Sequence, residues 1–390
     1  MEEVTRSIFV GMQILIDQKW VSDQAIVIEG QKIRAILPKE MIKHHLPAKQ
    51  YVFHKDCYLI PGLIDMHIHG IHGCDVMDGT EKALRTMSNA LAAEGVTGFL
   101  ATTMTATNAR LEKVLGVITA MMPSEEGAAI LGVHLEGPFI AKSKMGAQAG
   151  DDIQLPNIAL LQRWQMLTND AIKVVTLAPE LPGAIELITA LEKMRIIASV
   201  GHTNATYAET ATAIRAGCTQ ATHLFNAMSG LHHREPGAAG ALLMADNVTA
   251  ELIVDGVHLH PAIVELTWRI KGNDKVLLVT DAMRATCLGD GEYDLGGQVV
   301  EVIEKKAVLK DGTLAGSTLR LLQAVQNMVE FSKCTLAEAI YMASYNPAKV
   351  LGLLPNKGSI SIGKDADLVV LNSHLKVRMT MRGGREVFVK

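Results

Sequence analysis

The chain has 390 residues, of which 48% are hydrophobic and 20% are charged, and its formal net charge at pH 7 is −4. This composition is ordinary for a soluble globular protein with a large core, and it excludes an intrinsically disordered chain. The negative balance excludes a general attraction to nucleic acid or acidic membranes, so any anionic ligand would need a local cluster of basic groups.

The two ends of the chain predict one small β-sandwich module. Residues 1–58 and 355–390 contain short runs in which apolar and polar residues alternate, as they do in half-buried strands. Neither segment is long enough to bury a good core alone. We therefore expect the two segments to pair with each other beside a larger domain over residues 59–354.

The middle of the chain predicts a barrel. It contains eight short apolar runs separated by helix-length segments, at residues 63–69, 98–105, 130–136, 172–178, 196–202, 219–223, 249–255 and 276–281. Repeated strand–helix units form a parallel sheet, and eight of them favour a closed (β/α)8 barrel of the TIM type. The active site of such a barrel lies at the carboxyl ends of the strands, where residues far apart in sequence converge.

Several segments between the runs have their own signals. Helices are predicted at 83–94 and 204–216, where apolar residues share one face and Asn204 is the expected N-cap of the second. The polar stretch 139–157 is too long for a tight turn, and long loops in compact barrels often carry function. Residues 286–314 predict an inserted hairpin before a helix at 319–331.

Metal-binding side chains end four of the predicted strands. His67 and His69 are two residues apart, so both imidazoles point to the same face of a strand, and Glu136, His202 and His223 end three other runs. The alternatives are a surface histidine pair, a carboxylate that caps a loop and satisfied loop histidines. Convergence at one barrel mouth favours a divalent-cation site, and its imidazole and carboxylate ligands suit zinc, iron, manganese or cobalt.

Asp281 ends the eighth run and is the predicted general base. Beside a cation it could take a proton from metal-bound water and return it to a leaving group, whereas the alternatives are a helix cap or a plain metal ligand. A divalent ion can lower the pKa of bound water to about 7. Hydrolysis by metal-bound hydroxide is therefore favoured, since the chain has no GxSxG elbow and no nucleotide-binding glycine loop.

A second group of residues predicts an anion site. The sequence HHREPG at 232–237 follows the sixth run, and His258 follows the seventh, so Arg234 and His258 could meet above the barrel. Arginine binds phosphate through a planar fork of donors, to which histidine can add another. The alternative is a solvated basic loop, and spacing alone does not decide between them.

The cysteines and the lack of a membrane-length apolar run in the sequence indicate the cellular compartment. The five cysteines are far apart and form no CxxC pair, which fits a reducing environment. The sequence MEEVTRSIFV lacks a basic region followed by an apolar stretch, and no apolar run approaches the ~20 residues needed to cross a bilayer. We expect a cytoplasmic protein with no membrane partner.

Together, these motifs resemble the amidohydrolase superfamily and, within it, the N-acetylglucosamine-6-phosphate deacetylases. The matching stretches include PGLIDMHIHG, HLEGPF, GHTNAT, THLFNAM, HHREPG, DGVH, VTDAM and LAGST, and the whole set lies in family order between residues 61 and 370. The resemblance implies a distorted barrel with a β module from both termini, a homodimer, and removal of acetate from an N-acetylated amino-sugar 6-phosphate in amino-sugar catabolism and recycling.

The resemblance also implies roles for single residues. Glu136, His202 and His223 would hold the principal metal, His67 and His69 would be available for a second, and Asp281 would act as base and then acid. The implied substrate contacts are Ala147, Gln148, Asn226, Ala227, Arg234, His258, Leu314, Ala315, Gly316 and Ser317. Arg234 and His258 would reach across the dimer. The family usually has histidine where this chain has Gln148, which leaves open how the amide oxygen or a ring hydroxyl is held.

Other functions remain as alternatives. The substrate could be the galactosamine epimer or another small N-acyl compound, and the sequence does not separate these. A barrel that has lost catalysis and serves as a scaffold is disfavoured, because every candidate position holds a residue that is competent for its role.

Overall fold

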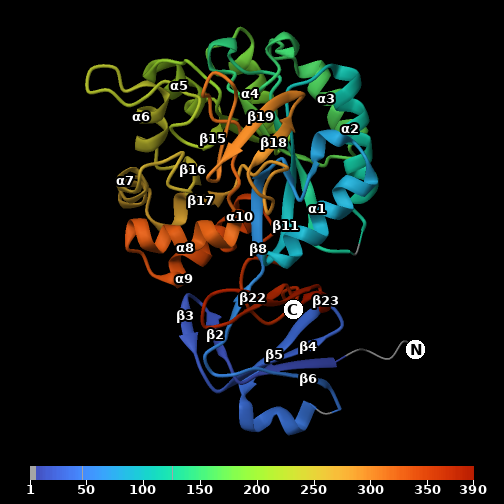
Figure 1. Cartoon of the computed structure of the whole chain (residues 1–390). Helices are drawn as coiled ribbons and strands as arrows, with labels where there is room; N and C mark the ends of the chain where they lie inside the picture. The colour runs from blue at the N-terminus through green and yellow to red at the C-terminus, as the bar shows by residue number, and fades with distance from the viewer. Residues whose placement is uncertain (1–5, 46, 125) are drawn as a thin grey trace.

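The computed structural model describes residues 6–45, 47–124 and 126–390. Figure 1 shows a large body of strands surrounded by helices and, below it, a smaller β module that holds strands from both ends of the chain. The larger body buries a continuous apolar core between the strands and the helices around them.

Eight parallel strands form the sheet of the larger body, in sequence order around it. They are β8 (Leu63–Ile68), β11 (Val96–Thr103), β12 (Ala129–Glu136), β13 (Ile172–Leu177), β14 (Ile197–Val200), β15 (Cys218–Ala221), β16 (Thr249–Ile253) and β17 (Val276–Val279). A parallel bridge between Ile68 and Ala282 brings the first and last strands together, and the Asp281 N–H donates to the His67 carbonyl at 2.8 Å. The predicted TIM-type barrel is therefore confirmed.

Helices cover the outside of the barrel (Figure 1). They are α1 (Glu81–Ala93), α2 (Asn108–Met121), α3 (Ile158–Leu167), α4 (Ala184–Lys193), α5 (Tyr207–Arg215), α6 (Gly237–Met244), α7 (Pro261–Lys271), α8 (Leu321–Ser332), α9 (Leu336–Ala343) and α10 (Tyr345–Val350). The spacing of the buried residues Leu84, Met87 and Leu91 explains α1, because positions three or four apart share one helix face. Short 3-10 turns lie at Lys39–His45, Val76–Asp78, Lys142–Lys144, Gly150–Asp152 and Asn273–Lys275.

The predicted N-cap of α5 is wrong. Thr206, not Asn204, caps this helix, because its hydroxyl accepts the Glu209 N–H while the Glu209 carboxylate accepts the Thr206 N–H. This reciprocal pair is a capping box, which satisfies two amide groups that the first helical turn leaves without a partner. Asn204 lies outside the helix, where its own N–H donates to Glu180.

The segment inserted after β17 is a small antiparallel sheet. Its strands are β18 (Gly291–Leu295), β19 (Gln298–Ile303) and β20 (Lys306–Val308), so the predicted hairpin has a third strand. A shorter pair, β9 (Gly70–Ile71) and β10 (Cys74–Asp75), follows β8. The inserted sheet approaches the loop after β12, since the Gln298 side chain donates to the Ala147 carbonyl at 2.7 Å.

The small module is built from both ends of the chain. Its six-stranded sheet has the order β23-β22-β21-β7-β2-β3, and its four-stranded sheet has the order β5-β4-β1-β6. The strands are β1 (Arg6–Val10), β2 (Gln13–Ile16), β3 (Lys19–Val21), β4 (Gln24–Glu29), β5 (Lys32–Pro38), β6 (Lys49–Val52), β7 (Tyr58–Pro61), β21 (Leu368–Leu371), β22 (Val377–Arg382) and β23 (Arg385–Val389). Antiparallel pairing of β7 with β21 joins the two ends, and one apolar cluster includes residues from both sheets.

The chain first passes from the module to the barrel through a single residue, and it returns to the module between α10 and β21. β7 ends at Pro61 and β8 begins at Leu63, so only Gly62 lies between them. A Cβ atom at Gly62 would lie 2.0 Å from the Thr97 hydroxyl oxygen, and therefore no larger residue fits there without a shift.

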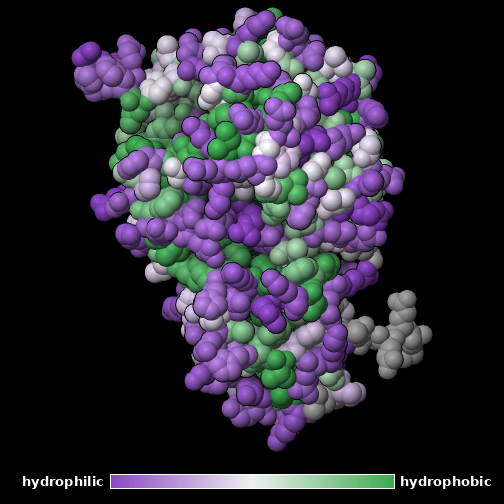
Figure 2. Space-filling view, in the orientation of Figure 1, coloured by the Kyte–Doolittle hydropathy of each residue, from purple (hydrophilic) through white to green (hydrophobic). Residues whose placement is uncertain are grey.

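No helix in the described part of the chain has the length and hydrophobicity that a membrane span requires. Figure 2 shows hydrophilic residues over most of the visible face, with hydrophobic residues in scattered patches.

Candidate metal centre and its pocket

Six titratable side chains converge at the carboxyl ends of the barrel strands. All six are buried, although they come from segments spread over more than two hundred residues. They are His67 and His69 on and after β8, Glu136 at the end of β12, His202 after β14, His223 after β15 and Asp281 after β17. The barrel thus brings together every metal-binding residue predicted from the sequence.

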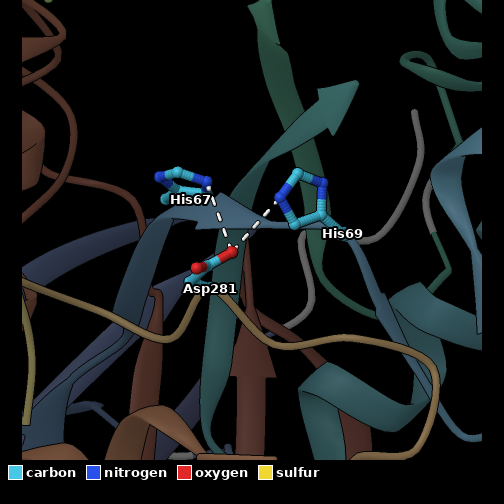
Figure 3. A group of neighbouring side chains, drawn as sticks. All are labelled: His67, His69 and Asp281. Atoms are coloured by element: carbon cyan, nitrogen blue, oxygen red, sulfur yellow. Dashed lines mark ion pairs between the residues drawn. The ribbon is translucent and has the colours of Figure 1, made fainter. Parts of the chain in front are cut away.

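The side chains form two adjoining groups. Glu136 Oε1 lies 3.1 Å from both His202 Nε2 and His223 Nε2, and these three residues form the first group. Asp281 Oδ1 lies 3.5 Å from His67 Nε2 and 3.2 Å from His69 Nε2 in the second group (Figure 3). Glu136 also connects the groups, because its Oε2 lies 3.2 Å from His69 Nε2.

Hydrogen bonds to the outer nitrogens orient three of the histidines. Nδ1 of His67 contacts Glu251 Oε2 at 3.0 Å, Nδ1 of His69 contacts a backbone carbonyl at 3.2 Å, and Nδ1 of His202 contacts the Lys144 carbonyl at 2.8 Å. A carboxylate or carbonyl oxygen can only accept, so each Nδ1 must carry the proton. In the neutral imidazole, Nε2 then presents a lone pair to the centre of the site, which is the form that binds metal.

The charges within the site depend strongly on one another. Burial raises the pKa of Glu136, but the charge of His67 and the contacts with His202 and His223 hold it well below its ordinary value. Burial also opposes ionisation of Asp281, yet His67 and His69 lower its pKa to about 2 despite repulsion from Glu136. Burial lowers the pKa of His69, whereas its hydrogen bonds to Asp281 and Glu136 raise it to about 10. Glu136 and Asp281, both ionised, therefore strongly favour positive charge at the barrel mouth, on the histidines or on a bound cation.

The donor set fits a divalent metal. His67 Nε2 is fully buried and has no hydrogen-bond partner, although it faces the other ligand atoms. A buried nitrogen without a partner is costly unless something binds it. Imidazole nitrogens and carboxylate oxygens are the ligands that first-row divalent metals share. The site is accordingly a candidate centre for a divalent metal.

The backbone around the site is strained. His202, His223, Ala227 and Asp281 all have positive φ angles, between 30° and 49°. Such angles are uncommon for residues other than glycine, and strain of this kind concentrates at functional sites. Three of these four residues are among the six that converge at the site, and they lie in the turns after β14, β15 and β17 that bring their side chains to the centre.

A pocket of about 460 Å³ opens above the six side chains. Both Glu136 and Asp281 line it, and the long loop after β12 forms one wall, as expected for a functional loop. The predicted substrate contacts that line the pocket are Ala147, Gln148, Asn226, Ala227, His258, Leu314 and Gly316. The predicted contacts Ala315 and Ser317 are buried outside this lining, and the Ser317 N–H donates to the Asp281 carbonyl at 2.7 Å.

Gln148 contacts a metal-binding residue directly. Its side-chain nitrogen donates to Glu136 Oε2 at 2.7 Å, and its side-chain oxygen accepts the Thr105 N–H at 2.6 Å. The amide therefore joins Glu136 to the backbone two residues after the end of β11. This geometry keeps Glu136 Oε1 directed toward the histidines.

Arg234 and His258 lie in different surroundings. His258 lines the pocket, and its Nδ1–H donates to Asp255 at 2.7 Å. Arg234 does not line this pocket but lies in an exposed loop, where its guanidinium contacts His233 at 2.8 Å. This loop, yellow-green in Figure 1, extends away from the barrel. Within one chain the two residues therefore do not share the pocket, contrary to the meeting that the sequence suggested.

Sequence reasoning missed Glu251, which contacts the site from below. This residue of β16 is fully buried and accepts the His67 Nδ1–H. The signal was a single carboxylate within the strand TAELI, whose residues are all buried. His134, in contrast, uses both ring nitrogens in contacts with Met66 and Thr176, and burial lowers its pKa to about 4, so it is not free to bind a metal.

Comparisons with known proteins agree with this geometry. The sequence model of the amidohydrolase family matches residues 58–387. N-acetylglucosamine-6-phosphate deacetylase of Bacillus subtilis (strain 168) is 44% identical over 86% of this chain and 85% of its own length. N-acetylgalactosamine-6-phosphate deacetylase of Escherichia coli O157:H7 is 37% identical over 94% of this chain and 95% of its own length.

A solved structure extends the comparison to the fold. A mutant of N-acetyl-D-glucosamine-6-phosphate deacetylase from Mycobacterium smegmatis, in complex with N-acetyl-D-glucosamine-6-phosphate, superposes with a TM-score of 0.92. It is 32% identical, and the match covers 99% of this chain and 100% of that one. The family resemblance drawn from the sequence motifs is thereby confirmed.

Proposed function

We propose that this chain, which belongs to the amidohydrolase family, removes the acetyl group from N-acetylglucosamine 6-phosphate to give acetate and glucosamine 6-phosphate. The observation that carries the proposal is the position of Asp281, whose carboxylate lies within 3.5 Å of two histidines at the floor of the pocket. The 44% identity to a deacetylase over most of the chain supports the substrate class.

The metal requirement is part of the proposal. Glu136, His202 and His223 would hold one divalent ion, and His67 and His69, with Asp281 beside them, would hold a second. Zinc is the proposed ion, and iron, manganese and cobalt suit the same ligands. When bound, such an ion polarises a carbonyl oxygen and lowers the pKa of water to about 7.

Asp281 is the proposed general base and acid. The contacts with His67 and His69 favour the ionised form of Asp281 and hold its pKa below the ordinary value, so at neutral pH the side chain is a carboxylate, the form that a general base requires. It would take a proton from the attacking water as the oxygen–carbon bond forms, and deliver it to the amide nitrogen as the carbon–nitrogen bond breaks. Acetate and the free amine are the balanced products.

The rest of the pocket would hold the sugar and its phosphate. Asn226, Ala227 and His258 lie on one side, and the inserted loop with Leu314 and Gly316 borders the sugar. Arg234 lies outside the pocket of its own chain, so we propose a homodimer in which Arg234 of each subunit reaches the neighbouring pocket. His258 then binds within its own chain.

The remaining assignments follow from this function. We propose that the catalytic domain spans residues 59–354 and that the module comprises 1–58 and 355–390. A cytoplasmic place in amino-sugar catabolism and recycling suits a phosphorylated substrate and five cysteines that are all free.

An acetate-release assay tests the activity. The purified protein, loaded in turn with zinc, iron, manganese or cobalt, is given N-acetylglucosamine 6-phosphate, its galactosamine epimer and unphosphorylated N-acetylglucosamine. We expect the highest kcat/KM on the glucosamine phosphate. A higher value on the epimer would assign the function of the 37% identical E. coli relative, and no release from any of the three would refute the proposal.

Arg234→Ala separates phosphate recognition from chemistry. Loss of a charged hydrogen bond to phosphate costs about 1.5–3 kcal/mol, so kcat/KM on the 6-phosphate should fall about 10- to 100-fold. Activity on the unphosphorylated sugar should change little. Arg215→Ala, at an exposed arginine of α5, is the matched control. An equal loss on both substrates would remove Arg234 from phosphate binding.

A further inference from the structure

Glu251 is a buried carboxylate beneath the metal centre that the proposed mechanism does not use. It lies on β16 with none of its surface exposed. Its Oε2 accepts the His67 Nδ1–H at 3.0 Å and the His223 backbone N–H at 3.2 Å, and its Oε1 accepts a Gln220 side-chain N–H at 2.7 Å. Two of these contacts are made with the metal-binding residues His67 and His223, and the third is made with β15, the strand that His223 follows.

The placement of this carboxylate is hard to explain by stability alone. Its neighbours on β16 are buried, and a buried charge is costly unless its partners compensate it. An apolar residue of similar volume would pack in a strand interior without that cost. Such a residue would, however, leave the outer nitrogen of His67 without an acceptor and would permit the other tautomer, in which Nε2 carries the proton and cannot bind a metal.

We propose that Glu251 is a positioning residue that fixes the tautomer and orientation of His67, and thereby sets the affinity of the ion that His67 binds. Its contact with His223 is to the backbone, so it does not choose the tautomer of that ring. This inference depends on the metal site of the proposed function but not on the substrate. Partners of this kind behind a metal ligand typically change metal affinity 10- to 100-fold.

Gln220 allows the charge to be removed without a change of shape. Its side-chain nitrogen donates to Glu251, while its side-chain oxygen has no hydrogen-bond partner. In Glu251→Gln, the new amide N–H can donate to that oxygen after the Gln220 amide turns over, and the new amide oxygen can still accept from His67. This variant therefore retains the packing and weakens the two hydrogen bonds that Oε2 accepts, from the His67 ring and from the His223 backbone, and only the first of these acts through His67.

A double-mutant cycle in cobalt binding tests the proposal. The metal-free full-length wild type, Glu251→Gln, His67→Asn and the double variant are titrated with Co²⁺ in competition with a chelator. The His67→Asn variant identifies the Co²⁺ ion whose binding depends on His67. We expect Glu251→Gln to raise the Kd of that same ion 10- to 100-fold. In the His67→Asn background, Glu251→Gln should change this Kd by less than about twofold further, because the imidazole through which Glu251 acts is absent.

Three results would overturn the proposal. These are no weakening by Glu251→Gln, equal weakening in both backgrounds, and a His67→Asn variant that binds Co²⁺ like the wild type. Thermal unfolding of the metal-free proteins, measured in parallel, shows whether a variant is folded. If Glu251→Gln does not fold, Gln220→Leu removes one donor to Glu251 and leaves the histidines intact, and it should weaken the same ion less strongly and only when His67 is present.

No substrate is used in these measurements. A protein that shows the expected cycle but releases no acetate would refute the proposed function and leave this inference intact. A protein that releases acetate but does not show the expected double-mutant cycle would support the proposed function and refute this inference.

Discussion

The mouth of the barrel and the small β module bury their residues in opposite ways. At the mouth, six buried titratable side chains are packed together and hold one another in charged form. In the module, the core shared by the two sheets is apolar, and charged residues such as Arg6 and Glu29 pair near its surface. The difference teaches that the mouth concentrates the chemistry of this chain in paired charges, whereas the module contributes stability through apolar burial.

This comparison makes opposite predictions for the two regions. Changes at the mouth should lower activity far more than they lower the stability of the metal-free protein. Changes in the module core should lower stability with little effect on the activity of the molecules that remain folded.

The largest effect is expected for Asp281→Asn. Loss of a general base and acid typically slows a reaction 10²- to 10⁴-fold, so kcat should fall by about this factor at saturating metal. At neutral pH the metal-free variant should be less stable than the wild type, because the attraction of His67 and His69, which lowers the pKa of Asp281, outweighs the repulsion from Glu136. Acetate release and thermal unfolding measure the two effects, with metal content as the control. Activity near that of the wild type would show that Asp281 does not transfer the proton.

Phe9→Ala is the matching change in the module. Phe9 is fully buried and stacks on Tyr51, with ring centroids 4.6 Å apart. Truncation of a buried phenylalanine costs about 3–5 kcal/mol. Urea unfolding should show this loss, while kcat/KM per folded molecule stays the same. Val52→Ala, at an exposed position of β6, is the control and should cost less than about 0.5 kcal/mol. A large fall in kcat/KM for Phe9→Ala would break the separation of the two regions.

The pair of Asp255 and His258 should make stability at the rim of the mouth depend on pH. Burial lowers the pKa of His258, but its hydrogen bond to Asp255 raises it above the ordinary value, while contacts with His258 lower the pKa of Asp255 despite burial. The contribution of His258 is therefore complete below its unfolded pKa of about 6.5 and is lost as pH rises through its folded pKa. The contribution of Asp255 is present above about pH 4 and is lost at more acid pH.

The measurement is the stability of wild type and Asp255→Asn in metal-free form. The difference should be about 1.5–3 kcal/mol at pH 6, as for a hydrogen bond between charged groups, and smaller at pH 9. Urea unfolding at both values, and at one between them, gives the trend. A difference that stays constant or grows toward pH 9 would show that the charge of His258 is not involved.

Much of the fold and of the metal site could be predicted because each depends on a local pattern. Eight apolar runs indicated eight strands, and a polar residue at the end of a strand must lie at the mouth of a barrel. Glu251 was missed because it lies within a strand, and only the tertiary structure shows that its side chain meets His67. The place of Arg234 was missed for a related reason, since the path of an exposed loop depends on contacts that the sequence does not reveal.

The smallest effect concerns the start of α5, where the sequence favoured the wrong cap. Both Asn204 and Thr206 are good N-cap types, so residue preference alone could not choose between them. Glu209 decides the choice, because it lies three residues after Thr206 and completes the capping box, which holds its pKa below the ordinary value.

Thr206→Ala should therefore lower the free energy of unfolding by about 1 kcal/mol, whereas Asn204→Ala should change it by less than about 0.5 kcal/mol. Urea unfolding of the two variants compares neighbouring positions on one segment, and the opposite ranking would show that Asn204 is the effective cap. Activity sharpens the comparison of regions, because α5 begins only a few residues after His202. If the barrel strands, and not α5, position the metal-binding residues, Thr206→Ala should leave kcat unchanged even though it destabilises the start of α5.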